Sequence, residues 1–163
     1  MARLKDLSAN AAAFLDMVAH SELGFLLSIP QADDGYRVVV GSTVKAPILF
    51  DSYADHPRHK IWIPRLKVYS TAAGRYQIIK NVWDWVQKLL NLPDFGPESQ
   101  DRAGIQLVKN RKALDLVEAG KIEEAIYACN LEWASLPGDR YGQGANPMEG
   151  LLSAYKASGG RVA

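Results

Sequence analysis

The chain has 163 residues, enough for one domain with a substantial core. Apolar residues make up 48% and charged residues 23%, as in an ordinary globular protein, and a net charge of +1 excludes attraction to nucleic acid by charge alone. The single cysteine, Cys129, excludes an internal disulfide and a zinc site built from thiolates. The N-terminus lacks the apolar run of a signal peptide, and we expect no segment with the composition of a membrane span and no stable membrane association.

The first predicted element is a helix over residues 8–22. Ser8 is a suitable N-cap, and Gly24 is a natural stop. Between them an apolar stripe recurs at helical spacing, formed by Ala11, Phe14, Leu15 and Val18. We therefore expect one face of this helix to lie in the core.

The pattern changes to that of a sheet over residues 36–50. Residues 36–40 are rich in β-branched side chains and precede the turn pair Gly41-Ser42, which predicts a strand, a reversal and a second strand in a small antiparallel sheet. Residues 51–66 are rich in Pro, His, Arg and aromatic residues, which indicates a loop with a short strand over residues 61–63.

Helices are predicted for most of the remaining chain. The first covers residues 73–90, with one apolar face made of Ile78, Val82, Trp85, Val86 and Leu89. Pro97 suits the first turn of a helix that ends near Asn110. Further helices are expected over residues 112–119, 121–133 and 148–158.

This order of elements indicates an α+β fold, mostly helical with a small antiparallel sheet. We expect a single domain over residues 1–163, in which a sheet-bearing lobe of approximately residues 25–70 lies across a cleft from a helical lobe.

Glu22 is the first candidate for a catalytic residue. It lies four residues after Val18 and so continues the apolar stripe, near the negative end of the helix dipole. Burial and the dipole both favour a raised pKa, and a carboxylic acid that stays protonated near neutral pH can protonate the leaving oxygen of a glycosidic bond. The alternative is a structural ion pair of Glu22 with Arg75 or Arg102.

Several segments resemble a known family in the same order along nearly the whole chain. They are Phe14 to Met17, Ser21-Glu22, Gly35-Tyr36, Val38 to Gly41, Asp55 to Arg58, Ser70 to Gln77, Phe95, Pro97, Ser99 to Asp101, Trp133 to Gly138 and Tyr141 to Gln143. This pattern is similar to that of the lambda-type phage endolysins, glycoside hydrolase family 104. His20 and Arg37 depart from it, since the family has Trp and Asp at these positions.

The resemblance implies a lysozyme-like fold and lytic transglycosylase activity with Glu22 as the catalytic acid. Peptidoglycan glycan strands would be cleaved at the β-1,4 bond between N-acetylmuramic acid and N-acetylglucosamine, leaving a 1,6-anhydromuramoyl end and needing no cofactor. It also implies a monomer made in the host cytoplasm, released by a holin, and acting on the cell wall from the periplasm to lyse the host.

The resemblance also points to substrate-binding residues. Ser70, Tyr76 and Gln77 fall in a block that lines the cleft beside the acid in the wider lytic transglycosylases, and we expect Tyr76 and Gln77 to open the helix after Gly74. Their hydroxyl and amide groups can hydrogen-bond sugars, although they can equally cap or pack the helix start. Tyr141 is the fourth candidate, for stacking on a sugar ring.

Three alternatives stay open at this point. A hydrolytic muramidase would need a second carboxylate, for which no acid shows comparable pattern evidence. A zinc amidase could use the run Asp55-His56-Pro57-Arg58-His59, although the chain has only three histidines and we expect no metal. A non-catalytic peptidoglycan-binding domain would need no acid at all.

Overall fold

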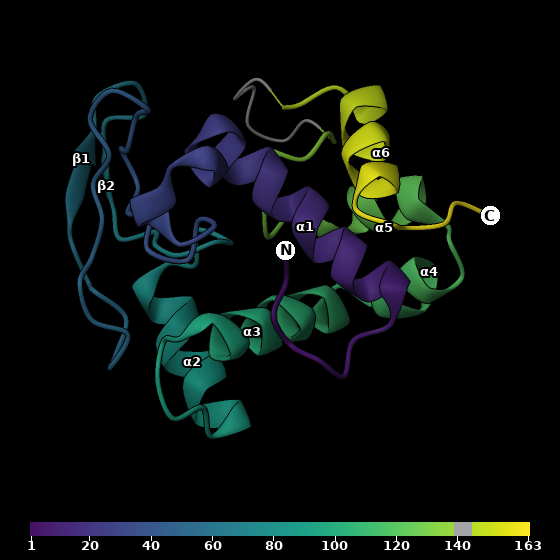
Figure 1. Ribbon diagram of the computed structural model, residues 1–163, viewed down its shortest axis with the longest axis horizontal. Coiled ribbons are helices and arrows are strands. Elements are labelled where there is room, and N and C mark those ends of the chain that lie inside the picture. Colours follow the sequence, from purple (N-terminus) through teal and green to yellow (C-terminus); the bar gives the residue numbers. More distant parts are fainter. Residues whose placement is uncertain (139–144) are drawn as a thin grey trace. The chain divides into compact units, whose positions relative to one another are not determined.

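The computed structural model describes residues 1–138 and 145–163 (Figure 1). The chain forms two compact units, the first made of residues 1–22 and 104–163 and the second of residues 23–103. The second unit carries the sheet, and it extends beyond the segment 25–70 that the sequence suggested.

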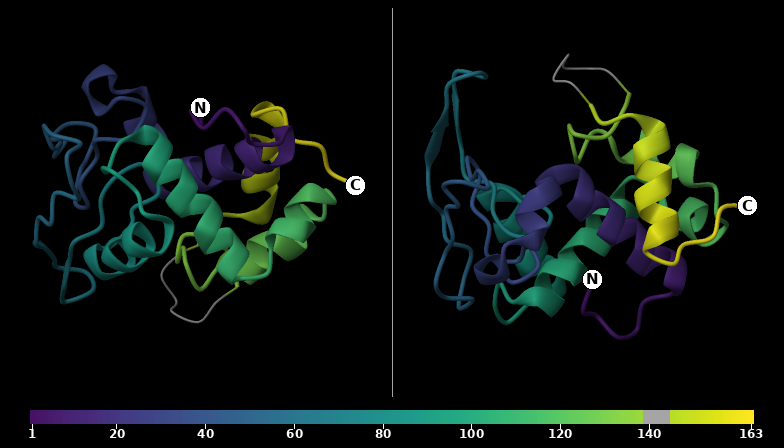
Figure 2. Two further views of the ribbon diagram at one scale, coloured as in Figure 1. Left: turned by 90° about the horizontal axis from the view of Figure 1, so that it is seen from below. Right: turned by 45° about the horizontal axis from the view of Figure 1, so that its top comes forward.

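The first unit is helical. It contains α1 (Ala9–Leu23, whose last residue falls in the second unit), the second half of α3 (Pro97–Asn110), α4 (Leu114–Glu118), α5 (Ile122–Cys129) and α6 (Met148–Ala157). Ser8 caps α1 as predicted, since its hydroxyl accepts a hydrogen bond of 3.0 Å from the amide of Ala11. The predicted stripe of α1 is buried, and α6 packs beside α5 (Figures 1 and 2).

The second unit holds two short 3-10 helices, η1 (Gly24–Ser28) and η2 (Pro30–Ala32), the strands β1 (Ile61–Ile63) and β2 (Val68–Ser70), and helix α2 (Lys80–Leu90). β1 and β2 form an antiparallel pair in which Trp62 lies opposite Tyr69. The predicted short strand at residues 61–63 is therefore confirmed, with a partner seven residues further along.

The predicted sheet over residues 36–50 is wrong in its extent. Val38 bridges Leu49 and Val39 bridges Ala73, but each is an isolated bridge outside the named strands. Val39 donates its amide to Ile48, whereas Val40 donates to Ala72. Because the segment divides its hydrogen bonds between two neighbours, neither ladder extends into a strand.

The helix predicted over residues 73–90 begins only at Lys80. Gly74 and Gln77 have φ values of +77° and +47°, which a helix cannot accommodate. Ala73 and Ile78 instead exchange two backbone hydrogen bonds of 3.1 and 2.9 Å in a tight reversal.

The buried face of α2 also differs from the prediction. Trp83 and Val86 are buried, whereas Trp85 and Leu89 are 45% and 53% exposed. Trp83 decides the orientation, because its indole packs edge-on against Phe95 with ring centroids 4.7 Å apart. A partner distant in sequence thus overrides the stripe that the local pattern favoured.

The expectation that no segment has the composition of a membrane span is also wrong. Within the described residues, the helical stretch Ala9–Ser28 is long and apolar enough, with a mean hydropathy of 1.2 over eighteen residues. Half of that window is buried inside the protein, as in the core helix of any folded domain, so its composition is weak evidence for a span.

Candidate active site

Glu22 lies in the last turn of α1, where the side chain is only partly exposed. The hydroxyl of Ser135 donates a hydrogen bond of 2.6 Å to its Oε1 atom. Burial raises the pKa of the Glu22 carboxyl above its ordinary value, and the hydrogen bond from Ser135 opposes that rise. The carboxyl therefore has the raised pKa that the sequence predicted for a general acid.

Ser135 is itself held by a hydrogen-bonded series within the first unit. The Ser21 hydroxyl lies 2.7 Å from the Ser135 hydroxyl, and the Asn146 amide donates to the Ser21 hydroxyl at 3.0 Å. Trp133 and Leu136 on either side of Ser135 are buried and fix this loop to the core. Sequence reasoning did not single out Ser135, although it lies in one of the blocks that carried the resemblance.

The alternative of a structural ion pair is not what the structure shows. Arg75 binds Asp34 through an ion pair of 2.8 Å and also donates to the Asp34 carbonyl, both within the second unit. Arg102 is exposed. Among the described residues, Ser135 is the hydrogen-bond partner of the Glu22 carboxyl.

Tyr76 is placed differently from the prediction. Its side chain is fully buried in the second unit, and its hydroxyl donates a hydrogen bond of 2.6 Å to Asp101. Tyr36 donates to the same Asp101 oxygen at 2.8 Å, and burial raises the pKa of Tyr76 well above its usual range. Tyr76 does not open a helix, and this placement favours a structural role over contact with a sugar.

Ser70 and Gln77 lie in the same unit and are both half-buried. Ser70 ends β2, and its hydroxyl accepts the amide of Ala72 at 3.2 Å, so it stabilises a turn and caps no helix. Gln77 donates from Nε2 to the carbonyl of Gly74 at 2.9 Å, which leaves its side-chain carbonyl available as an acceptor. Tyr141, the fourth candidate, lies outside the described residues.

Comparison with known proteins decides the family, because the sequence model of the endolysins matches residues 12–162. The chain belongs to the endolysin family. It is 43% identical over 151 residues to the endolysin of Escherichia phage lambda, covering 92% of this chain and 91% of that protein. The endolysin of Escherichia phage P2 is 44% identical over 155 residues, with 93% of each protein covered.

Solved structures agree with the sequence relatives. Bacteriophage lambda lysozyme complexed with a chitohexasaccharide is similar with a TM-score of 0.87 and 39% identity, over 98% of this chain and 100% of that one. Lambda lysozyme in a second structure gives a TM-score of 0.84 at 38% identity, with the same coverage. The predicted α+β, lysozyme-like fold and the resemblance to lambda-type endolysins are therefore confirmed.

Within the histidine run of this endolysin-family member, His56 has a structural role. His56 is buried, its Nδ1 accepts the amide of Arg58 at 3.0 Å, and its Nε2 lies 2.9 Å from the carbonyl of Ile78. Nε2 must therefore carry the proton, and burial lowers the pKa of the ring, which favours this neutral form. With both ring nitrogens occupied, His56 cannot bind a metal, and the described residues contain no cluster of three metal-binding side chains.

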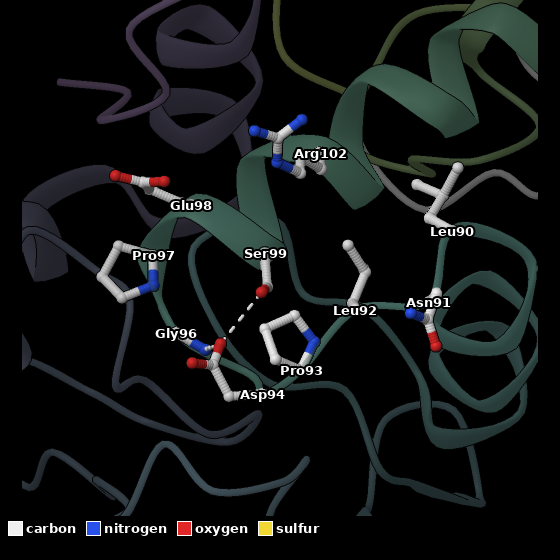
Figure 3. Close-up of a pocket in the computed structure, with 10 residues that line it drawn as sticks. All are labelled: Leu90, Asn91, Leu92, Pro93, Asp94, Gly96, Pro97, Glu98, Ser99 and Arg102. Atoms are coloured by element: carbon white, nitrogen blue, oxygen red, sulfur yellow. Dashed lines mark hydrogen bonds between the residues drawn. The ribbon is translucent and has the colours of Figure 1, made fainter.

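A cavity of about 410 Å³ lies at the start of α3, within the second unit (Figure 3). Its carboxylate Asp94 accepts hydrogen bonds from the Gly96 amide at 2.8 Å and the Ser99 hydroxyl at 2.9 Å, so it stabilises the turn that leads into the helix. Among the residues that the structure describes, none of the predicted site residues lines this cavity. We therefore assign it no catalytic role.

The β1–β2 hairpin carries an exposed aromatic pair that the sequence analysis did not assign. The rings of Trp62 and Tyr69 have centroids 5.0 Å apart, and the two residues are 46% and 59% exposed. The ammonium of Lys60 lies 4.8 Å from the centroid of Tyr69. Exposed indole and phenol rings beside a cation offer an apolar surface with polar edges, as carbohydrate binding needs.

Proposed function

We propose that the chain is a lytic transglycosylase that cleaves the β-1,4 bond between N-acetylmuramic acid and N-acetylglucosamine in peptidoglycan. The observation that carries the proposal is Glu22, a partly buried carboxyl with a raised pKa that is held by Ser135. Membership of the endolysin family and the similarity to a lambda lysozyme that binds a chitohexasaccharide support a glycan substrate.

In this mechanism Glu22 acts first as an acid and then as a base. It gives its proton to the oxygen that leaves C1 of the muramic acid, and the C1–O4 bond breaks. The ionised Glu22 then takes the proton of the C6 hydroxyl of the same sugar while O6 bonds to C1. No water is consumed, and the proximity of O6 and C1 in one sugar replaces a bimolecular attack.

The aspartates of the second unit are engaged in hydrogen bonds or ion pairs. Each of them has a hydrogen-bond or ion-pair partner within that unit, namely Asp33, Asp34, Asp51, Asp55, Asp84, Asp94 and Asp101. A retaining or inverting hydrolase needs a second carboxylate that is available to attack the sugar or activate a water. In a transglycosylase the sugar supplies the nucleophile itself.

Product analysis tests this choice of reaction. Mass spectrometry of digested peptidoglycan is expected to show muropeptides with anhydromuramic ends, one water lighter than reducing ends. Digestion in water enriched in heavy oxygen is expected to leave these products unlabelled, because no water enters the bond. Reducing ends that carry the heavy oxygen would instead identify a hydrolytic muramidase, and release of free peptides would identify an amidase.

Trp62 on the hairpin is proposed to contact the glycan, and the substitution Trp62→Ala is expected to weaken glycan binding. Loss of one stacking ring should raise KM or Kd about three- to tenfold with little change in kcat. Trp85→Ala is the matched control, because Trp85 on α2 is 45% exposed against 46% for Trp62. Titration of both variants with soluble glycan measures the difference, and equal affinities would remove Trp62 from the binding surface.

The remaining proposed contacts are Ser70 and Gln77, which offer a hydroxyl and an amide group to the sugars, and Tyr141, which is proposed to stack on a sugar ring. As in the sequence analysis, the enzyme is proposed to act as a monomer without a cofactor. Its family supports a role in host lysis, with synthesis in the host cytoplasm, release by a holin and action on the cell wall from the periplasm.

A further inference from the structure

Four polar groups form a series that ends on the proposed catalytic acid. Asn146 precedes α6, Ser21 lies in the last turns of α1, and Ser135 lies in the loop after α5. The contacts run from the Asn146 amide to the Ser21 hydroxyl at 3.0 Å, from Ser21 to the Ser135 hydroxyl at 2.7 Å, and from Ser135 to Oε1 of Glu22 at 2.6 Å. All four residues belong to the first unit.

The hydrogen bonds of this series all run in one direction, towards Glu22. Nδ2 of Asn146 lies 3.0 Å from the backbone carbonyl of Ser21, and a carbonyl can only accept, so the atom there must be the amide nitrogen. The same nitrogen donates to the Ser21 hydroxyl, and the Ser21 hydroxyl donates its own proton to Ser135. Ser135 in turn donates to Oε1 of Glu22.

We propose that Ser135 is a positioning residue for the reaction. Ser21 and Asn146 orient the Ser135 hydroxyl so that Oε1 of Glu22 always accepts its hydrogen bond, and the proton that is transferred to the sugar resides on Oε2. The inference rests on the proposed function of Glu22. While Oε1 accepts the hydrogen bond of the Ser135 hydroxyl, it cannot also carry the acidic proton on the side that faces Ser135. The protonated carboxyl therefore has one orientation, with its proton on Oε2. The series thereby selects the oxygen that protonates the sugar bridge and later accepts the C6 proton.

The same hydrogen bond also balances the two protonation states of Glu22. Burial disfavours the ionised carboxylate, whereas the donated proton of Ser135 stabilises it. The acid must be protonated for the first step and ionised for the second, so both influences are needed. Of the titratable side chains that flank the series along the chain, His20 is exposed, Glu132 binds Arg111 at 2.7 Å and Glu149 is exposed.

The test is Ser135→Ala, with the rescue variant Ser135→Thr, which keeps the hydroxyl. Ser135→Ala is expected to lower kcat about ten- to a hundredfold with KM within about twofold of the wild type, because a hydrogen bond to a charged group is lost while substrate contacts stay. Activity disappears as pH rises through the pKa of Glu22. Since loss of the donor raises that pKa, the alkaline limb of the kcat profile is expected to move to higher pH.

A direct measurement separates this role from a merely structural one. Titration of the Glu22 carboxyl by carbon NMR should show a higher pKa in Ser135→Ala than in the wild type, and Ser135→Thr should restore both the pKa and kcat. Ser21→Ala, which removes the group that orients Ser135, should give a smaller change in the same direction. It also provides the test if Ser135→Ala does not fold, and Ser153→Ala on the exposed face of α6 serves as the control.

The outcomes distinguish this inference from the proposed function. If Glu22→Gln is inactive but the serine variants keep the wild-type kcat and the wild-type alkaline limb, the positioning role is wrong and the catalytic acid stands. If the variants lose activity only in proportion to the amount of folded protein, with an unchanged pKa of Glu22, the role of Ser135 is structural. If Glu22→Gln itself remains active, the proposed function fails first.

Discussion

Glu22→Gln is expected to abolish the clearing of purified cell walls while the protein keeps its fold and its affinity for glycan. Glutamine has the shape of glutamate, and its side-chain carbonyl can still accept the hydrogen bond that Ser135 donates at 2.6 Å. What disappears is the transferable proton. Because general acid catalysis contributes about two to four orders of magnitude, kcat should fall by about that much, as measured by turbidity of wall suspensions.

Glu132→Gln is the matched control for this variant. Glu132 lies in the same unit and is also partly buried, but its carboxylate binds Arg111 at 2.7 Å instead of a hydroxyl. We expect Glu132→Gln to lose some stability and little activity per folded molecule. Binding of soluble glycan by Glu22→Gln should stay within about twofold of the wild type. Clearing of cell walls by Glu22→Gln at the wild-type rate would disprove the catalytic assignment.

Local patterns were sufficient to predict α1 and the partial burial of Glu22, whereas the proposed role of Glu22 as the acid depended on the family resemblance. The Ser8 cap, the apolar stripe and Gly24 all lie within one short segment, and the structure has the helix at Ala9–Leu23. Glu22 was found because it continues that stripe, so its partial burial followed from helical spacing alone. The start of α3 at Pro97 could be predicted for the same reason, since proline at the first helical position is a local preference.

The segment between Ala73 and Lys80 could not be predicted from local pattern. Its side chains are suitable for a helix, but the buried amide of Gln100 accepts the backbone amide of Arg75 at 2.9 Å and so stabilises a turn. Asp101 holds the Tyr76 hydroxyl in the core of the same unit. Both partners lie 25 residues away along the chain, where no periodicity can indicate them.

Ser135 was missed for a related reason. It lies 113 residues from Glu22 in the sequence. Serine is common in exposed turns, so its presence in this loop gave no signal of a contact with Glu22. The resemblance of the block Trp133 to Gly138 marked the segment without saying which side chain contacts the acid. Only the folded chain brings the hydroxyl within hydrogen-bond distance of Oε1.

Gly74→Ala is expected to cause the largest loss of stability among the variants considered. Gly74 has a φ of +77°, which costs a residue with a side chain about 1 kcal/mol or more. A Cβ there would overlap the side-chain oxygen of Gln100 and lie 2.7 Å from its Cδ and 3.1 Å from the Phe95 ring. Because these neighbours are buried, overpacking adds about 1–3 kcal/mol, for a total of about 3 kcal/mol.

Gly150→Ala provides a control of opposite sign. Gly150 lies in α6 with nothing within 4 Å of a Cβ, so alanine should raise stability by up to about 1 kcal/mol through its helix propensity. Calorimetry is expected to show Tm lowered by about 10 °C for Gly74→Ala and raised by a few degrees for Gly150→Ala. If both substitutions shift Tm alike, the turn at Gly74 does not need its left-handed backbone. The contact of Gln100 with that turn would then not explain why α2 begins only at Lys80.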